Sequence, residues 1–162
     1  MSQRNKKILR NALLAMVVAF AAIQFVPVRD IGSNPPARYK MDAPPEVESI
    51  LRRACFDCHS NETRWPLYSR MAPGSWLMSR DVHNGRAHHN FSEWGDVDED
   101  ERQTDRENCW EQVEAGNMPP WFYLYPMHLS ARLSPADKAL LKDYLLKGSV
   151  KKPGGAADPP AK

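Results

Sequence analysis

The sequence pattern with the clearest chemistry is Cys55-Phe-Asp-Cys-His59, in which two thiols three positions apart are followed directly by an imidazole. On one helical turn the thiols point to the same side and can add to the two vinyl groups of a single porphyrin. The histidine then reaches the iron, which commonly takes an imidazole ligand. Because this spacing is the attachment signature of c-type haem, we expect Cys55, Cys58 and His59 to hold one covalent haem c, with His59 on the iron.

Two other chemistries use a Cys-x-x-Cys pair. A thioredoxin-type dithiol follows a strand, whereas a stripe of helical spacing precedes Cys55. A structural zinc site takes four nitrogen or sulfur ligands, and the chain offers only one further cysteine, Cys109. Zinc would therefore need an irregular mixture of cysteines and histidines. We interpret Cys109 itself as a buried, inert thiol.

The predicted second iron ligand is Met118, in the segment Gly116-Asn-Met-Pro-Pro120. Haem c iron usually takes a methionine or a second histidine opposite the first. Two prolines stiffen this loop, so holding the thioether costs little further entropy. His/Met ligation fills both axial positions, raises the reduction potential relative to two histidines and opposes peroxide chemistry. The rival ligands are Met127, His128, His83, His88 and His89.

Helical patterns surround these residues. Over residues 46–58, apolar side chains recur at spacings of three and four, which predicts an amphipathic helix that ends on the Cys-x-x-Cys-His motif. Further helices are expected from a Ser75 cap to about Gly85, over about 103–115, and from a Ser134 cap to Gly148. The acidic stretch at residues 96–101 is interpreted as solvated surface. The predicted fold class is all-α: a cytochrome c-like helical domain with long ordered loops, preceded by one N-terminal membrane-anchor helix.

The chain divides by composition into five segments. Residues 1–10 form a basic head without acids, and residues 11–28 an apolar run that predicts a transmembrane signal anchor, with a cleaved signal as the alternative. The positive-inside rule leaves the head in the cytoplasm. The other segments are a Pro-rich tether that lets the domain swing, a c-type haem-binding domain and a disordered tail, at residues 29–45, 46–148 and 149–162.

The motifs together are similar to those of the bacterial haem-binding domain family, over about residues 40–148. The similarity is carried by the segments Cys55–Tyr68, Ala72–Leu77, Asn90–Trp94 and Gly116–Pro120. It implies a single c-type haem on an exported, often membrane-anchored domain. We therefore expect a protein of the bacterial inner (cytoplasmic) membrane, with a single pass and its haem domain facing the periplasm.

Several residues within the similar segments have expected roles around the haem. Trp65 and Trp76, with other tryptophans, are interpreted as pocket or core aromatics, because a flat macrocycle needs large apolar walls. One indole N–H is a candidate donor to a haem propionate. Arg86 and Arg64 are candidates to pair with the propionates, where a guanidinium binds in bidentate fashion.

The expected function is one-electron transfer between a membrane complex and an exported redox partner protein. No nucleophile–base pair is visible, so we do not expect an enzyme. The alternative is a haem peroxidase-like enzyme or a gas or redox sensor with a labile sixth ligand, in which His83 or His128 acts as an acid–base group. A third possibility is a haem subunit of a larger membrane complex. The net charge of +2, from 22 basic and 20 acidic residues, gives no reason to expect nucleic acid as a partner.

Overall fold

The computed structural model describes residues 2–38 and 40–147. This part of the chain is helical and contains no strand, which confirms the predicted all-α class. The predicted disordered tail lies outside the described residues. The α-helices are α1 Gln3–Ile23, α2 Pro45–Ala54, α3 Phe56–His59, α4 Gly74–His88, α5 Glu99–Glu114, α6 Trp121–Leu124 and α7 Pro135–Lys147. The 3-10 turns are η1 Leu67–Arg70, η2 Trp94–Asp96 and η3 Leu129–Ala131.

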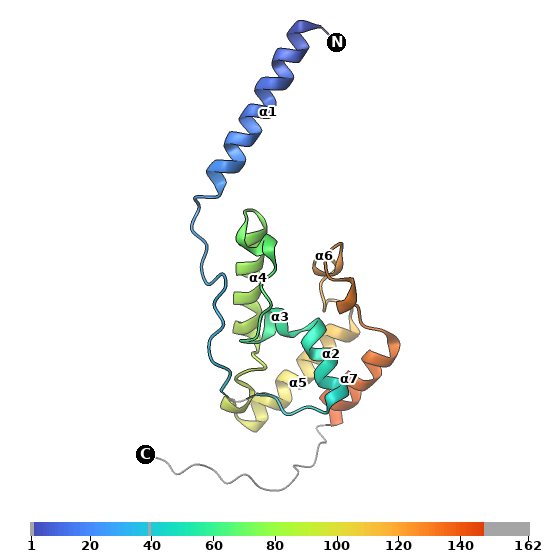
Figure 1. The fold of residues 1–162 in the computed structure, drawn as a ribbon. Coiled ribbons are helices and arrows are strands. Elements are labelled where there is room, and N and C mark those ends of the chain that lie inside the picture. Colours follow the sequence, from blue (N-terminus) through green and yellow to red (C-terminus); the bar gives the residue numbers. More distant parts are fainter. Residues whose placement is uncertain (1, 39, 148–162) are drawn as a thin grey trace, which may run out of the picture.

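The core forms where α2, α5 and α7 pack together in the lower half of Figure 1. The predicted apolar stripe of α2 is buried throughout, which confirms its amphipathic assignment. Leu141 and Leu145 of α7 are 1% and 2% exposed, and Trp110 of α5 is also buried. Burying such side chains is the main favourable term in folding. The helix that leads into the Cys-x-x-Cys-His motif is therefore anchored by the core.

Helix boundaries follow local capping chemistry. The helix predicted over residues 46–58 is divided, because the backbone of Cys55 leaves helical geometry between α2 and α3. The predicted cap of the last helix is confirmed, since the Ser134 hydroxyl accepts from the Asp137 N–H at 3.1 Å. The helix expected to begin at a Ser75 cap instead begins at Gly74, after Pro73, without a side-chain cap. It also continues three residues past Gly85.

The acidic stretch at residues 96–101 has a structural role that the sequence analysis did not anticipate. Its acidic side chains are exposed, as predicted. Asp98 also caps α5, because its carboxylate accepts from the Glu101 N–H at 2.9 Å. Carboxylates in a first turn stabilise the positive end of the helix dipole. The helix therefore starts at Glu99, four residues before the predicted start at about residue 103.

The N-terminal segment forms α1, which projects away from the other helices (Figure 1). None of its residues is buried. It includes most of the basic head and ends at Ile23, whereas the predicted anchor covered residues 11–28. Over the ranges that the structure describes, no helix is both long enough and apolar enough to span a membrane, so the predicted spanning helix is not found.

Residues 24–44, here called the strap, connect α1 to α2 and run beside α4 (Figure 1). Turns occur near its start, residues 33–38 have no regular secondary structure, and the strap is bound to the domain. The Gln24 side-chain amide bonds both the carbonyl and the N–H of Ala72, at 3.2 and 2.9 Å. Further along, the Met41 N–H donates to the Phe91 carbonyl at 3.0 Å. The swinging motion expected of a loose tether does not agree with these contacts.

Candidate functional site

The Cys-x-x-Cys-His motif occupies a single helical turn. The backbone N–H groups of Cys58 and His59 both donate to the Cys55 carbonyl, at 3.1 and 2.9 Å. Neither motif cysteine forms a disulfide. Desolvation by the surrounding protein raises the pKa of each thiol to about 12, so both are protonated at neutral pH. The structure thus brings together the three residues that the spacing singles out.

His59 is held in one orientation by a backbone group. Its Nδ1 lies 3.3 Å from the carbonyl oxygen of His89. Burial lowers the pKa of His59, which favours the neutral ring. Because the carbonyl can only accept, Nδ1 carries the proton and Nε2 keeps its lone pair. This is the state in which an imidazole binds a metal, with its ring fixed by the hydrogen bond of its other nitrogen.

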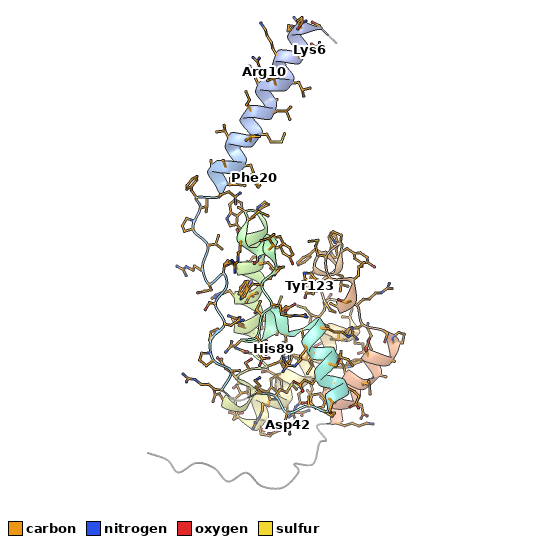
Figure 2. All side chains as sticks on the ribbon, viewed as in Figure 1. Lys6, Arg10, Phe20, Asp42, His89 and Tyr123 are labelled. Atoms are coloured by element: carbon orange, nitrogen blue, oxygen red, sulfur yellow. The ribbon has the colours of Figure 1, made fainter. Side chains whose placement is uncertain are left out.

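The side chain of His89 also contacts His59. The two rings stack with centroids 4.3 Å apart and 10° between their planes. The Nε2 of His89 lies 3.2 Å from the Sγ of Cys109, whose predicted burial is confirmed. Burial lowers the pKa of His89 to about 3. His89 (Figure 2) thus covers one face of His59 instead of lying across from it, which disfavours its assignment as the second iron ligand.

The three histidines between residues 83 and 89 lie within α4 or directly after it. His83 and His88 are exposed, but they belong to α4. His89 follows α4 directly and is only partly exposed.

A glycine allows α4 to approach the motif closely. A Cβ on Gly85 would lie 2.4 Å from the carbonyl oxygen of Cys58 and 2.9 Å from its carbonyl carbon. Both atoms belong to the backbone and cannot move aside. Only glycine therefore fits at this crossing of α4 and α3, because it has no Cβ.

Asp57, between the two motif cysteines, is 5% exposed and fully engaged in hydrogen bonds. Arg64 binds it through Nε at 3.2 Å and Nη2 at 3.1 Å, and the Tyr123 hydroxyl donates to it at 2.9 Å. Tyr123 (Figure 2) stacks on His128 with centroids 4.2 Å apart, and the Nε2 of His128 lies 2.6 Å from the Tyr68 hydroxyl. This network fastens α6 and η1 to α3, and it uses the Arg64 guanidinium that was expected to bind a propionate.

Trp65 and Arg86 both contact the strap. The Trp65 indole N–H donates to the Asn34 side-chain oxygen at 3.3 Å, so it is not available to a propionate. Arg86 donates through Nε to the Ser60 carbonyl at 2.9 Å and through Nη2 to Asn34 at 3.0 Å. Arg86 therefore lies beside the motif, because Ser60 directly follows it. Within the described residues Arg86 forms no salt bridge.

Met118 and Trp76 lie outside this network. Met118 follows α5, its N–H donates to the Gln112 carbonyl at 3.2 Å, and its side chain is 38% exposed. Trp76, near the start of α4, is also 38% exposed. Within residues 2–38 and 40–147, no hydrogen bond joins the Met118 side chain to the Cys-x-x-Cys-His motif. The assignment of Met118 as an iron ligand therefore stays a prediction.

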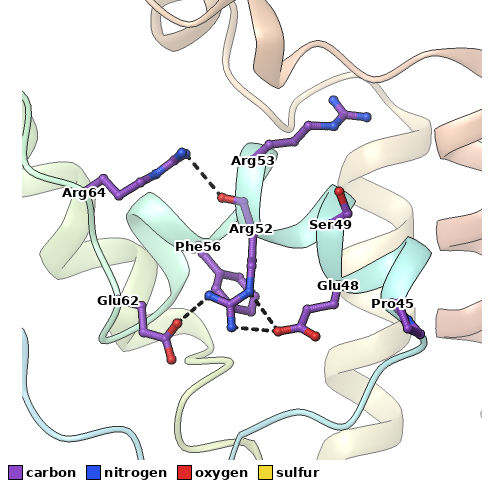
Figure 3. Close-up of a pocket in the computed structure, with 8 residues that line it drawn as sticks. All are labelled: Pro45, Glu48, Ser49, Arg52, Arg53, Phe56, Glu62 and Arg64. Atoms are coloured by element: carbon purple, nitrogen blue, oxygen red, sulfur yellow. Dashed lines mark hydrogen bonds and ion pairs between the residues drawn. The ribbon is translucent and has the colours of Figure 1, made fainter.

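A pocket of about 480 Å³ lies beside Phe56, on the outer side of α2 (Figure 3). The motif cysteines and His59 do not line it. The guanidinium of Arg52 lies 5.1 Å from the Phe56 ring centroid and pairs with Glu48 and Glu62, at 2.7 and 2.6 Å. Arg53, a further lining residue, pairs outward with Asp137. Because its arginines are matched by carboxylates, the pocket presents no excess of positive charge.

The zinc alternative gains no support from the geometry. Among the residues that the structure describes, no group of three or more cysteine, histidine or acidic side chains is arranged to hold a metal ion.

The helical fold and the Cys-x-x-Cys-His turn with its oriented histidine define a small all-α protein with one thiol–imidazole motif. The chain belongs to the haem-binding domain family, whose model matches residues 18–147. The matched range includes the strap and the end of α1 as well as the helices from α2 to α7. No curated protein and no solved structure matches the chain significantly. Haem is therefore the ligand of this domain.

The residues present fit a haem. The motif supplies two reduced thiols and an imidazole Nε2 with its lone pair, as described above. The indole Nε1 of Trp94 is buried without a hydrogen-bond partner in the described structure, so a donor is left for a further acceptor. Large apolar side chains are exposed around η1 and the start of α4, and around α6 and the loop before it. These two regions lie on either side of α3 in Figure 1. The exposed residues are Leu67, Met71, Trp76, Leu77, Met118, Trp121 and Phe122. A macrocycle needs such apolar walls.

Sequence reasoning missed three residues around the motif. His89 was considered only as an alternative iron ligand, although it borders a segment that carries the family similarity. Tyr123 was not considered, and nothing in its local sequence indicates a bond to a residue 66 positions earlier. Gly85 was interpreted as the end of a helix, whereas its role is the close contact with Cys58.

Proposed function

We propose that this haem-binding domain is a c-type cytochrome that carries single electrons. The observation that carries the proposal is the motif turn. Two reduced thiols lie on one helical turn, and the adjacent His59 has Nδ1 on a carbonyl, which leaves Nε2 with its lone pair as the nitrogen that can ligate a metal. In this proposal Cys55 and Cys58 form thioether bonds to the haem vinyl groups. The family match supports haem as the group, and the covalent attachment rests on the motif.

A bound haem would supply reversible one-electron chemistry between ferric and ferrous iron. His59 would ligate the iron through Nε2, and Met118 would bind opposite through its sulfur. Arg86 is the remaining candidate for a propionate, because its hydrogen bonds go to neutral acceptors and leave its charge unpaired in the described structure. Trp94 replaces Trp65 as the candidate indole donor, since its Nε1 is buried and unpartnered among the described residues.

The attachment is tested by denaturing the purified holoprotein and asking whether haem remains on the chain. We expect retention in the wild type and in Cys109→Ala, which removes the one cysteine outside the motif. Loss is expected when Cys55 and Cys58 are both changed to Ala. Haem that stays on this double variant after denaturation would refute the attachment site.

The ligation and the electron-carrier role are tested by absorption spectra of ferric and ferrous protein with and without carbon monoxide. A thioether–ferric charge-transfer band is expected in the wild type and in Met127→Ala, whose methionine is 63% exposed, but not in Met118→Ala. A full set of axial ligands leaves no position for carbon monoxide. Rapid binding of carbon monoxide by the wild type would favour the peroxidase-like or sensor alternative.

We further propose that α1 attaches the protein to the bacterial inner membrane, with the haem domain on the periplasmic side. The support is the composition of α1: basic residues without acids near its start, followed by apolar side chains of which none is buried. Haem staining of cell fractions should find the full chain in the membrane pellet, and protease added to spheroplasts should cleave the haem domain. Replacing Val17 and Val18 by lysine should release it. A wild-type chain found only in the cytoplasm would contradict the proposal.

A further inference from the structure

We propose that His89 and Cys109 are positioning residues that fix the ring plane of His59, and that they thereby tune the electronic properties of the haem. The proposal rests on the proposed role of His59 as an iron ligand. It assigns to these two side chains a purpose beyond the attachment motif.

His89 controls the His59 ring in two ways. Its backbone carbonyl accepts from Nδ1 at 3.3 Å, which sets the tautomer and one direction of the ring. Its imidazole lies flat on the His59 imidazole, with 10° between the planes, which restricts rotation about the remaining side-chain bond. One residue thus determines both the protonated nitrogen and the ring plane.

Cys109 holds the second ring in place. Its Sγ lies 3.2 Å from the Nε2 of His89, and it comes from α5, an element distant in sequence from the motif. A cysteine is a small side chain with a weak hydrogen-bonding group. Its contact orients the His89 ring at the end opposite the backbone. Without it, the ring could turn away from His59 by a change of rotamer.

Phe91 also contacts the two stacked imidazoles. Its ring stands edge-on to His89 and to His59, with centroids 5.4 and 6.3 Å apart. Its N–H donates to the His59 carbonyl at 2.8 Å, which fixes the backbone of the ligand. The His59 ring is therefore bounded by His89 on its face and Phe91 at an angle. The contacts form a supporting layer of the kind that orients metal-bound histidines in proteins.

The expected consequence is specific to the iron. The orientation of an axial imidazole and the strength of its Nδ1–H hydrogen bond set ligand basicity and therefore the reduction potential. A change at Cys109 should alter these properties even where the fold and the attached haem are retained. A cysteine that only fills space would not show this dependence on its hydrogen bond.

The test compares two substitutions in holoprotein with attached haem, Cys109→Ser and Cys109→Val. Serine keeps a hydrogen-bonding group toward His89, and valine keeps an apolar side chain of similar size without one. We measure the reduction potential and the NMR shifts of the haem methyl groups, which report the plane of the axial imidazole. Cys109→Val should shift both quantities, and Cys109→Ser should retain the wild-type values.

His89→Phe provides a second variant in case Cys109→Val does not fold. It keeps a flat ring against His59 but loses the contact with Cys109, so it should reproduce the valine shift. Wild-type values in all three variants would overturn the proposal, as would equal shifts in the serine and valine variants. If instead the wild type shows no covalent haem or no histidine ligation, the proposed function fails and this inference fails with it. Unshifted values in the variants of a wild type that has both overturn this inference alone.

Discussion

At the scale of single residues, the motif is determined by its neighbours as much as by its own sequence. The thiols and the imidazole lie on one turn because they are contiguous, but the His59 tautomer depends on the carbonyl of residue 89. The position of that turn depends on Gly85, which lets the backbone of α4 meet the backbone of Cys58. Glycine therefore acts here through its missing side chain.

Gly85→Ala should destabilise the protein. The new Cβ would lie 2.4 Å from a backbone oxygen, so α4 must move away from α3. Overpacking of this kind costs about 1–3 kcal/mol, and alanine returns up to about 1 kcal/mol of helix propensity. We expect the free energy of unfolding to fall by about 1–2 kcal/mol in urea titration, with a lower yield of attached haem.

Asn84→Ala is the matched control, because it places an alanine at an exposed neighbouring position of the same helix. It should leave stability unchanged or slightly higher. Equal stability of the two variants would show that the contact between α4 and Cys58 is not tight in solution.

At the scale of elements, α2 is fastened to α7 and the turn before it by polar contacts as well as by the core. Arg53 pairs with Asp137 at 2.7 Å and donates to the carbonyls of Ser130 and Arg132, at 2.9 and 3.1 Å. Asp137 also accepts from Ser134, in the first turn of α7. One carboxylate thus serves both the helix cap and the contact between helices.

The contribution of Asp137 should depend on pH. Burial alone would raise its pKa, but the hydrogen bonds from Arg53 and Ser134 outweigh it and lower the pKa below the ordinary 3.8. A group with a lowered pKa stabilises the fold above its unfolded value and loses this effect as the pH falls through its folded value. The free energy of unfolding should therefore decrease below about pH 4, as monitored by circular dichroism in urea.

Asp137→Asn should weaken this pH dependence. It should also lower the free energy of unfolding by about 1 kcal/mol at pH 7, as expected for a partly exposed ion pair such as that of Asp137 with Arg53. Asp143→Asn, at an exposed carboxylate of the same helix, should keep the wild-type profile. An unchanged acid profile in Asp137→Asn would show that other groups control acid unfolding.

At the scale of the whole molecule, the strap makes the N-terminal segment part of the domain. Contacts extend along it from Gln24, through Asn34, to Met41. The family match begins at residue 18 and so includes the strap. The hydrogen bonds of the strap therefore couple the orientation of α1 to the helices that surround the motif.

Hydrogen exchange should distinguish a bound strap from a loose tether. Peptides covering residues 33–42 should exchange more slowly than an unstructured chain, because strap amides donate to domain carbonyls. Arg86→Gln removes charged donors to Ser33 and Asn34 and should speed this exchange. Arg80→Gln, at an exposed arginine on the same helix, should not. Exchange of these wild-type peptides at the rate of an unstructured chain would contradict the bound strap and support a flexible tether.

The sequence by itself determined those features whose partners lie close along the chain. The thiols and the imidazole fall on one helical turn, the apolar stripe of α2 repeats at helical spacing, and Ser134 caps the helix that starts beside it. Family motifs identified the ligand for the same reason, since each motif is contiguous. These features follow from local backbone geometry and need no knowledge of the fold.

Only the tertiary structure decided which distant groups surround the motif. His89 reaches His59 from the end of α4, Cys109 reaches His89 from α5, and Tyr123 reaches Asp57 from α6. The strap was also decided at this level, because its bonds go to segments that are distant in sequence. Such contacts depend on how helices pack, and packing is governed by the buried surface of the whole domain and not by any local pattern.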